Sequence, residues 1–314
     1  MDTGVRLLYF AADLLLPLVA GYLCCRRGWL SERVIDRIVS FNIVVVSTLL
    51  AALSFWGLTL DAGLVWLPVL GVGVSLIPGL LAYYRSGRKY GSELDQGSYL
   101  LAAALSNMGT VGGLCVFFMY GETGFAYTQL MTMFFNVVVF AVCFPLAQYY
   151  YIKGQSAAKP VICWSAVLFS RNQLPVVGLL AGMGLTVGGL PKPVAVSEFF
   201  SVLIHFGAWT ALLPVGFSIN FGEMKKYYVD ILDLIPIKFV VTPLVIYWLA
   251  QVTIGDTVAD HTALVLASTP PAINSVLTAK IHNLNVDIAM ASFVVLTVLF
   301  LAVVYPVLFF WIMY

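Results

Sequence analysis

A run of helix-breaking residues interrupts an apolar stretch late in the chain: Ala267-Ser268-Thr269-Pro270-Pro271-Ala272-Ile273-Asn274. The surrounding segment, Thr262–Ile281, is long enough to cross a bilayer, which takes about 20 residues. Pro270 and Pro271 remove two backbone donors and obstruct the carbonyls one turn back, so a continuous helix cannot form there. Backbone groups freed in hydrocarbon must find partners in protein or at a water-filled cavity. The run therefore predicts a broken transmembrane helix that does not face lipid at its break.

The composition places the whole chain in a membrane. Of its 314 residues, 61% are apolar and only 10% are charged, whereas charged residues make up roughly a quarter of soluble proteins. The net charge of +1 gives no reason to expect a nucleic-acid partner. No polar stretch is long enough to fold alone. We therefore expect an all-α polytopic membrane protein whose constant partner is the lipid bilayer.

Apolar windows bounded by charges, Gly or Pro predict ten transmembrane helices. In order they are Val5–Leu23, Ile35–Phe55, Leu64–Tyr84, Tyr99–Met119, Phe125–Tyr150, Leu174–Leu190, Val194–Ile219, Ile231–Val252, Thr262–Ile281 and Ile288–Trp311. Most of the 16 Lys and Arg residues fall in the odd-numbered connections, which the positive-inside rule assigns to the cytoplasm. Both termini are therefore expected outside the cytoplasm.

The longest polar connection, residues 153–171, divides the predicted helices into two sets of five. An odd number of spans forces the two sets to be inverted, so residues 1–152 and 172–314 are expected to form two inverted repeats joined by a cytoplasmic connection. An offset of 161 residues places Ser106–Gly113 over Ala267–Asn274, so the fourth and ninth helices are interrupted at equivalent positions. Such paired interruptions indicate the binding site of a secondary transporter.

The two interruptions supply the candidate binding residues. Glycines weaken the fourth helix by about 1 kcal/mol each relative to Ala, and each interruption adds an asparagine amide to the freed backbone groups. The N-terminal ends of half-helices present partial positive charge, which suits an anionic ligand. The alternative to a binding site is a purely structural role, in which the Gly-rich helix packs closely on a neighbour and the prolines only kink their helix. The predicted substrate-binding residues are Asn107, Gly109, Gly112, Pro270, Pro271, Asn274 and Ser275.

The residues leave open whether transport is driven by H⁺, by Na⁺ or only by the membrane potential. Intramembrane charges are costly and therefore functional by default, so a proton-coupled carrier would use Asp13 in the first helix or Lys280 at the cytoplasmic end of the ninth. Oxygen ligands for sodium would come from Asn107, Thr110, Asn274, Ser275 and Thr278.

Two further polar positions are given mainly structural interpretations. Lys238, in the eighth predicted helix, is interpreted as a side chain that extends its charged end to the membrane surface, with a role in transport as the alternative. His205 and Trp209 stand one helical turn apart and are expected to form a packed pair rather than to line a cavity.

Motifs of enzymatic chemistry are absent from the sequence. It contains no His/Cys/Asp/Glu cluster at metal-ligand spacing, no G-x-S-x-G, no H-E-x-x-H and no phosphate-cradling loop. We therefore expect neither an enzyme activity nor a metal or cofactor.

The same interruptions carry a resemblance to the auxin efflux carrier family. Asn107-x4-Gly112 followed by Tyr120-Gly121-Glu122 is similar to the family's fourth-helix signature. The segment Thr269–Lys280, followed by Asp287, Thr297 and Pro306, resembles its pattern P-x-A-x-N-S…A and D…T…P. The resemblance extends over nearly the whole chain, and its ninth-helix part is the most specific.

The resemblance implies the ten-helix fold of the bile/arsenite/riboflavin transporter-like superfamily. In that fold the broken fourth and ninth helices cross in a bundle that moves against a scaffold of helices 1, 2, 6 and 7, often in a homodimer. The implied substrate is a small organic anion, either an auxin-like aromatic acid or a dicarboxylate such as malate or malonate. Two features depart from the family: Val46 and Ser47 replace a usual proline, and the connection 153–171 is short. The short connection indicates a bacterial carrier, located in the inner membrane.

Two other functions stay open at this point. One is a sodium-coupled symporter of the bile-acid class. The other is a membrane sensor that keeps the fold but has lost movement, because a fold alone does not fix a function.

Overall fold

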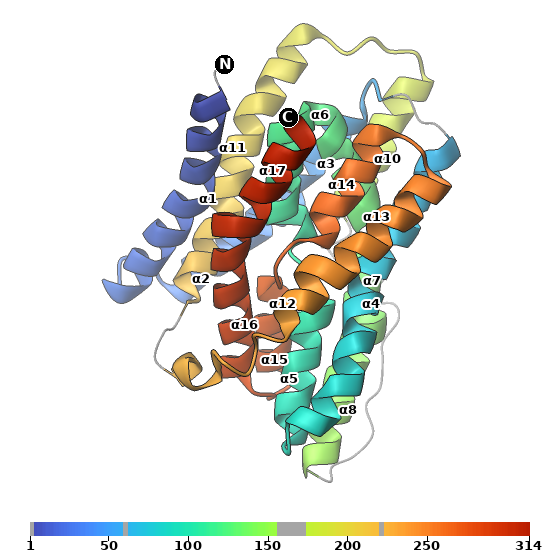
Figure 1. Cartoon of the computed structure of the whole chain (residues 1–314). Helices are drawn as coiled ribbons and strands as arrows, with labels where there is room; N and C mark the ends of the chain where they lie inside the picture. The colour runs from blue at the N-terminus through green and yellow to red at the C-terminus, as the bar shows by residue number, and fades with distance from the viewer. Residues whose placement is uncertain (1–2, 59–61, 156–173, 220–222) are drawn as a thin grey trace. The chain divides into compact units, whose positions relative to one another are not determined.

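The computed structural model describes residues 3–58, 62–155, 174–219 and 223–314 (Figure 1). The regular structure in these ranges is helical, and their one β feature is an isolated antiparallel bridge between Ser106 and Pro271. The all-helical prediction is thus confirmed. Most of the predicted connection 153–171 lies outside the described residues.

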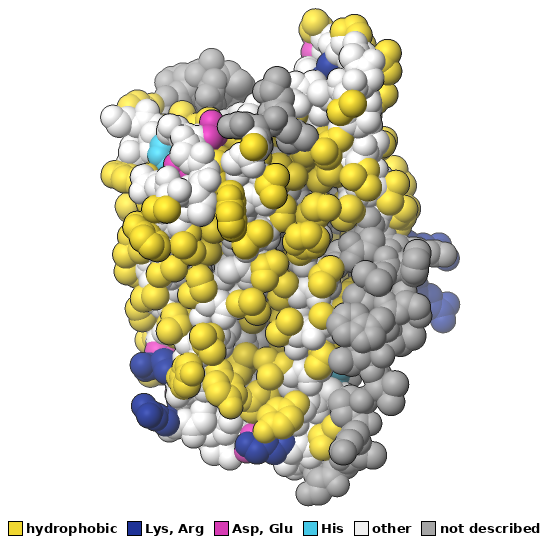
Figure 2. Space-filling view, turned by 90° about the vertical axis from the view of Figure 1, so that its right-hand side faces the viewer, with side chains coloured by type: hydrophobic (Ala, Val, Ile, Leu, Met, Phe, Trp, Pro, Cys, Tyr) yellow, Lys and Arg dark blue, Asp and Glu magenta, His cyan; other side chains and the backbone are white. Residues whose placement is uncertain are grey.

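Six helical stretches among the described residues are long and apolar enough to cross a membrane, and three further apolar helices are shorter. The six are Glu32–Phe55, Ala62–Lys89, Met108–Gly154, Val194–Phe217, Leu234–Thr253 and Val286–Met313, and the shorter three are Leu15–Arg26, Leu174–Val187 and Thr257–Ala267. Many large apolar side chains point outward; Trp248 and Val298, for example, are 61% and 62% exposed. Figure 2 shows apolar side chains over most of the middle of one face. So much exposed apolar surface is stable only against lipid.

The chain forms two compact units. The first comprises Met1–Ala62, Gly109–Gln129 and Phe169–Ile219. Its helices are α1 (Thr3–Arg26), α2 (Glu32–Phe41) with its π-helical continuation η1 (Asn42–Ser47) and α3 (Thr48–Phe55), most of α6 (Gly113–Thr132), α10 (Leu174–Val187) and α11 (Val194–Phe217).

Two close helix pairs hold the first unit together. Helix α1 packs on α11 at Gly21, where an added Cβ would lie 2.0 Å from the carbonyl oxygen of Leu213. Helix α10 packs on α3 at Gly182, where an added Cβ would lie 2.2 Å from the carbonyl oxygen of Ala52. Small residues allow such backbone contact in membranes, where dispersion between close surfaces drives helix association. The 161-residue offset that aligns the interruptions also relates Gly21 to Gly182 and Ala52 to Leu213.

The second unit comprises Gly63–Met108, Leu130–Leu168 and Asn220–Tyr314. Its main helices are α4 (Trp66–Lys89), α5 (Glu93–Ala104), α7 (Phe135–Val138), α8 (Phe144–Gln155), α12 (Leu234–Pro236), α13 (Thr242–Thr253), α14 (Thr257–Ala267), α15 (Ile273–Ile281), α16 (Val286–Leu299) and α17 (Tyr305–Met313). Three π-helical segments join consecutive helices: η4 (Val139–Cys143), η7 (Ile237–Val241) and η8 (Phe300–Val304). Both α15 and α16 lie against α5 (Figure 1).

The predicted boundary between the fourth and fifth helices is confirmed. The element α6 (Gly113–Thr132) comprises two helices that meet at a kink at Gly121, whose φ of 61° and ψ of −145° only glycine adopts readily. The chain reverses there, so that an added Cβ at Gly124 would lie 2.6 Å from the side chain of Val116. The fourth predicted helix, Tyr99–Met119, is in turn divided among the end of α5, the π-helical segment η3 (Met108–Gly112) and the start of α6. The chain is therefore interrupted where the glycines and Asn107 predicted it.

Candidate functional site

Within the second unit, Leu105–Asn107 of the first interruption lies beside Pro270–Ala272 of the second, and the two segments are hydrogen-bonded to each other. The N–H of Asn107 donates to the carbonyl oxygen of Pro270 at 2.8 Å, and the N–H of Ala272 donates to that of Leu105 at 2.7 Å. These bonds flank the bridge between Ser106 and Pro271. Proline has no backbone N–H to donate, but the donors of these two bonds are Asn107 and Ala272. Pro271 therefore removes no hydrogen bond from this short ladder. The backbone groups freed by the breaks thus satisfy one another.

Three half-helix ends converge on this bridge. Helices α5 and α14 end just before it, at Ala104 and Ala267, and α15 begins just after it, at Ile273. The carbonyls at the end of α14 accept side-chain bonds from Ser268 and Thr269, at 2.8 and 2.7 Å. At the start of α15, by contrast, the N-cap residue Ala272 offers no side-chain cap. That N-terminal end keeps N–H groups available for an anion.

The structure brings together five of the seven predicted binding residues. Asn107, Pro270 and Pro271 are buried at the bridge, and Asn274 and Ser275 lie in the first turn of α15. The Ser275 hydroxyl donates to the carbonyl oxygen of Ala272 at 2.7 Å. The half-buried amide of Asn274 has no hydrogen-bond partner within the described ranges. It is therefore the predicted side chain most available to a ligand.

The remaining predicted residues are distributed differently. Gly109 and Gly112, together with Thr110, form η3 and belong to the first unit by their contacts. Thr278 donates its hydroxyl to the carbonyl oxygen of Asn274 at 2.7 Å, one turn along α15. Lys280 is exposed in the last turn of that helix.

The interpretation of Lys238 as a side chain that reaches the membrane surface is wrong. Its exposed fraction is 0%, and its Nζ donates to the carbonyl oxygen of Ala103 at 3.2 Å and to the hydroxyl of Ser106. Hydropathy along one segment cannot reveal this, because the acceptors come from a distant part of the chain. The one available signal was a single lysine inside an apolar span, which is functional by default.

Asp13 and His205 form an intramembrane pair in the first unit. The Asp13 carboxylate contacts His205 Nδ1, with side-chain exposures of 13% and 42%. The ring of Phe118 packs edge-on against the imidazole at 6.2 Å between centroids. The predicted packed pair of His205 with Trp209 is therefore wrong, because the imidazole turns to a carboxylate and Trp209 is 38% exposed.

A half-buried ion pair of the first unit holds the kink of α6. Lys192 contacts the carboxylate of Glu122, the residue after Gly121, and also donates to the carbonyl oxygen of Leu53 at 2.8 Å. The single ammonium thus ties the kink to the end of α3.

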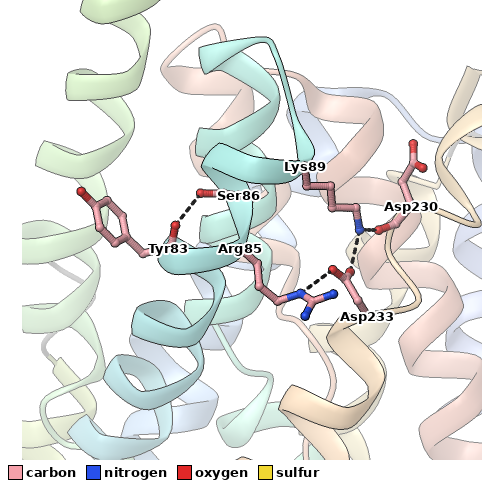
Figure 3. A network of polar contacts seen from close by, with 6 residues as sticks. All are labelled: Tyr83, Arg85, Ser86, Lys89, Asp230 and Asp233. Carbon is pink, nitrogen blue, oxygen red and sulfur yellow. Dashed lines mark hydrogen bonds and ion pairs between the residues drawn. The ribbon is translucent and has the colours of Figure 1, made fainter.

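Charged residues at the end of α4 form a polar cluster away from the bridge (Figure 3). Arg85 and Lys89 contact the carboxylate of Asp233 at 3.0 and 2.7 Å, and Lys89 also contacts the carbonyl oxygen of Asp230. Next to this cluster, burial and then the nearby Asp230 raise the pKa of the Tyr90 phenol. The cluster fixes the chain before α12 to α4 and has a structural role.

Comparison with known proteins points to transport. No protein-family model matches the chain. Over 207 residues it is 24% identical to a protein of Rhizobium meliloti (strain 1021) named "Putative malonate transporter". The match covers 65% of this chain and 63% of that protein. The similarity supports a transporter family, but it does not distinguish the auxin efflux carriers from other transporter families. It is also consistent with a protein that is not an enzyme. The chain is thus an all-helical membrane protein with a distant relative named as a transporter of an organic anion.

Proposed function

We propose that this protein is a secondary carrier of a small dicarboxylate such as malonate or malate. The observation that carries the proposal is the pair of backbone hydrogen bonds between Leu105–Asn107 and Pro270–Ala272. Two interrupted helices bonded to each other inside a membrane protein are costly to build, and they survive where they create a polar site. The similarity to a protein named as a malonate transporter favours a dicarboxylate over an aromatic acid.

The start of α15 is the proposed contact for one substrate carboxylate. Its uncapped N–H groups are donors, as is the amide of Asn274, which has no hydrogen-bond partner among the described residues, and the helix dipole adds partial positive charge. An anion there accepts hydrogen bonds from these donors. Asn107 and Ser275 stand beside it and shape the site.

Alternating access is proposed to arise from movement of the two units. The first unit holds the first, second, sixth and seventh predicted helices, the set that the family resemblance assigns to the scaffold, and in addition Gly109–Gln129 from the fourth and fifth. The second unit holds the hydrogen-bonded interruptions. We propose that the second unit carries the substrate while the first stays fixed in the bilayer.

The inverted repeat belongs to the same proposal and has structural support. An inverted repeat with a 161-residue offset requires that a contact in one half recur in the other with the partners exchanged. The contact of Gly21 with Leu213 recurs as that of Gly182 with Ala52. Chance matches of this kind are rare, because both the glycine and its carbonyl partner must obey the offset.

Counterflow in proteoliposomes tests the proposal. Vesicles that contain purified protein and unlabelled malonate are diluted into a trace of radiolabelled malonate. A carrier accumulates the label transiently, whereas a sensor with the same fold binds malonate without exchanging it. Competition by malate, an aromatic acid and a bile acid then ranks the substrate classes. Failure to exchange any of these anions would reject the carrier.

A further inference from the structure

Lys238 takes over a hydrogen bond that the interruption of α5 breaks. In a continuous helix the carbonyl oxygen of Ala103 accepts from the N–H four residues later, which belongs to Asn107. Here the Asn107 N–H donates to Pro270 instead, so the Ala103 carbonyl is left without its helical donor. The ammonium of Lys238 donates to that oxygen at 3.2 Å. Its second partner, the hydroxyl of Ser106, belongs to the bridge itself.

Lys238 lies in an irregular helical segment that packs against η8. It lies in η7, a π-helical segment that precedes Pro243, and such segments are frequent at functional sites. The hydroxyl of Thr242 donates to the carbonyl oxygen of Ile237 at 2.7 Å, and the ring of Phe239 stacks on Phe300. The first contact lies within the same helical stretch, and the second packs the segment that carries Lys238 against η8.

The charge of Lys238 is compensated unusually weakly. The buried or half-buried cations Lys89 and Lys192 each contact a carboxylate. Lys238 is fully buried and has no carboxylate partner in the described part of the chain. Carbonyl and hydroxyl dipoles at the C-terminal end of α5 favour a cation there, but they offset only part of the cost of burying an ammonium. An ammonium has three donors, and the described protein groups occupy two of them.

We propose that Lys238 is the fixed cation of the anion site, whose ammonium supports the interruption and supplies the positive charge that a substrate carboxylate requires. This inference rests on the proposed carrier function. Cation-coupled carriers place a metal ion among carbonyl and hydroxyl oxygens at broken helices, and Lys238 puts an ammonium among the same kinds of oxygen. Malonate transport is then expected to proceed without sodium.

The test separates the charge of Lys238 from its hydrogen bond. Lys238→Gln keeps a donor that reaches toward Ala103 but removes the charge, Lys238→Met removes both, and Lys238→Arg keeps the charge. Lys225→Gln, at an exposed lysine of the same unit, is the matched control. Malonate affinity is measured by calorimetry on purified protein. Uptake by the natural chain is measured with external sodium and with N-methylglucamine.

The expected result is specific to the charge. Malonate binding weakens about tenfold or more in Lys238→Gln and Lys238→Met, as for loss of an interaction with a charged group, while Lys225→Gln binds normally. The natural chain transports equally well in both salts. Unchanged affinity in folded Lys238→Gln overturns the inference, and so does uptake that requires sodium, although both results leave the carrier function intact. Absence of any anion binding by the natural chain removes both proposals. Should the neutral variants not fold, the sodium comparison alone decides.

Discussion

The backbone N–H of Asn107 donates a 2.8 Å hydrogen bond to the carbonyl oxygen of Pro270, and this bond joins two segments from opposite halves of the chain. It takes the place of the helical hydrogen bond that the Asn107 N–H would donate to the carbonyl oxygen of Ala103 in a continuous helix. The interruptions therefore form one structural feature rather than two independent kinks. The predictions below test its surroundings and the two units that the chain forms.

Asn274→Ala is expected to abolish malonate counterflow while the protein still folds. The half-buried Asn274 amide has no hydrogen-bond partner in the described residues. Its removal therefore changes the stability of the fold little but removes a hydrogen-bond donor to the substrate. Counterflow and the melting temperature of the purified protein are measured together. Gln251→Ala, which removes an exposed amide from α13, is the control and keeps normal exchange. Normal counterflow in Asn274→Ala would show that α15 does not contact the substrate.

Gly182→Ala is expected to destabilise the first unit by about 1–3 kcal/mol, because the new methyl group overpacks the contact with Ala52. Its Cβ would lie 2.2 Å from a backbone oxygen, which cannot move without shifting α3. Gly184→Ala on the same helix meets nothing within 4 Å and should stabilise the helix by up to about 1 kcal/mol. Melting temperatures in detergent compare the two variants. Equal values would mean that α10 and α3 do not pack as described.

Asp13→Asn tests the prediction from the sequence that a proton-coupled carrier would use Asp13, and on that prediction it uncouples malonate transport from a pH gradient. The Asp13 carboxylate contacts His205 within the first unit. Counterflow of malonate should persist, because exchange requires no net proton movement, whereas accumulation driven by a pH gradient should be lost. Asp36→Asn, at an exposed position of α2, serves as the control. Gradient-driven accumulation that survives in Asp13→Asn would place proton coupling elsewhere.

Acid is expected to destabilise the protein through His282. Burial lowers the pKa of this imidazole from its ordinary value of 6.5, and its Nε2 is buried without a hydrogen-bond partner among the described residues. The unfolded chain therefore takes up the proton first, and stability falls as the pH drops below about 6.5. His282→Gln should lose less melting temperature than the natural chain between pH 7.5 and 5.5. An identical pH dependence in both proteins would contradict the assignment to His282.

The sequence alone predicted the features that depend on local chemistry. Apolar runs must lie in lipid, and prolines or clustered glycines must interrupt a helix wherever they occur, so the break at Pro270 and Pro271 was predictable without coordinates. The kink at Gly121 was marked by the turn signal around it. Each of these inferences needs only the residues within one or two helical turns.

Only the tertiary structure decided which polar groups meet. The buried ammonium of Lys238 finds its acceptors at Ala103 and Ser106, and Asp13 finds His205, across large separations in sequence. Hydropathy along the chain gives the depth of a charge in the membrane but not the direction in which its side chain points. The free energy of a buried charge depends on the dipoles and charges around it, and those are brought there by helix packing.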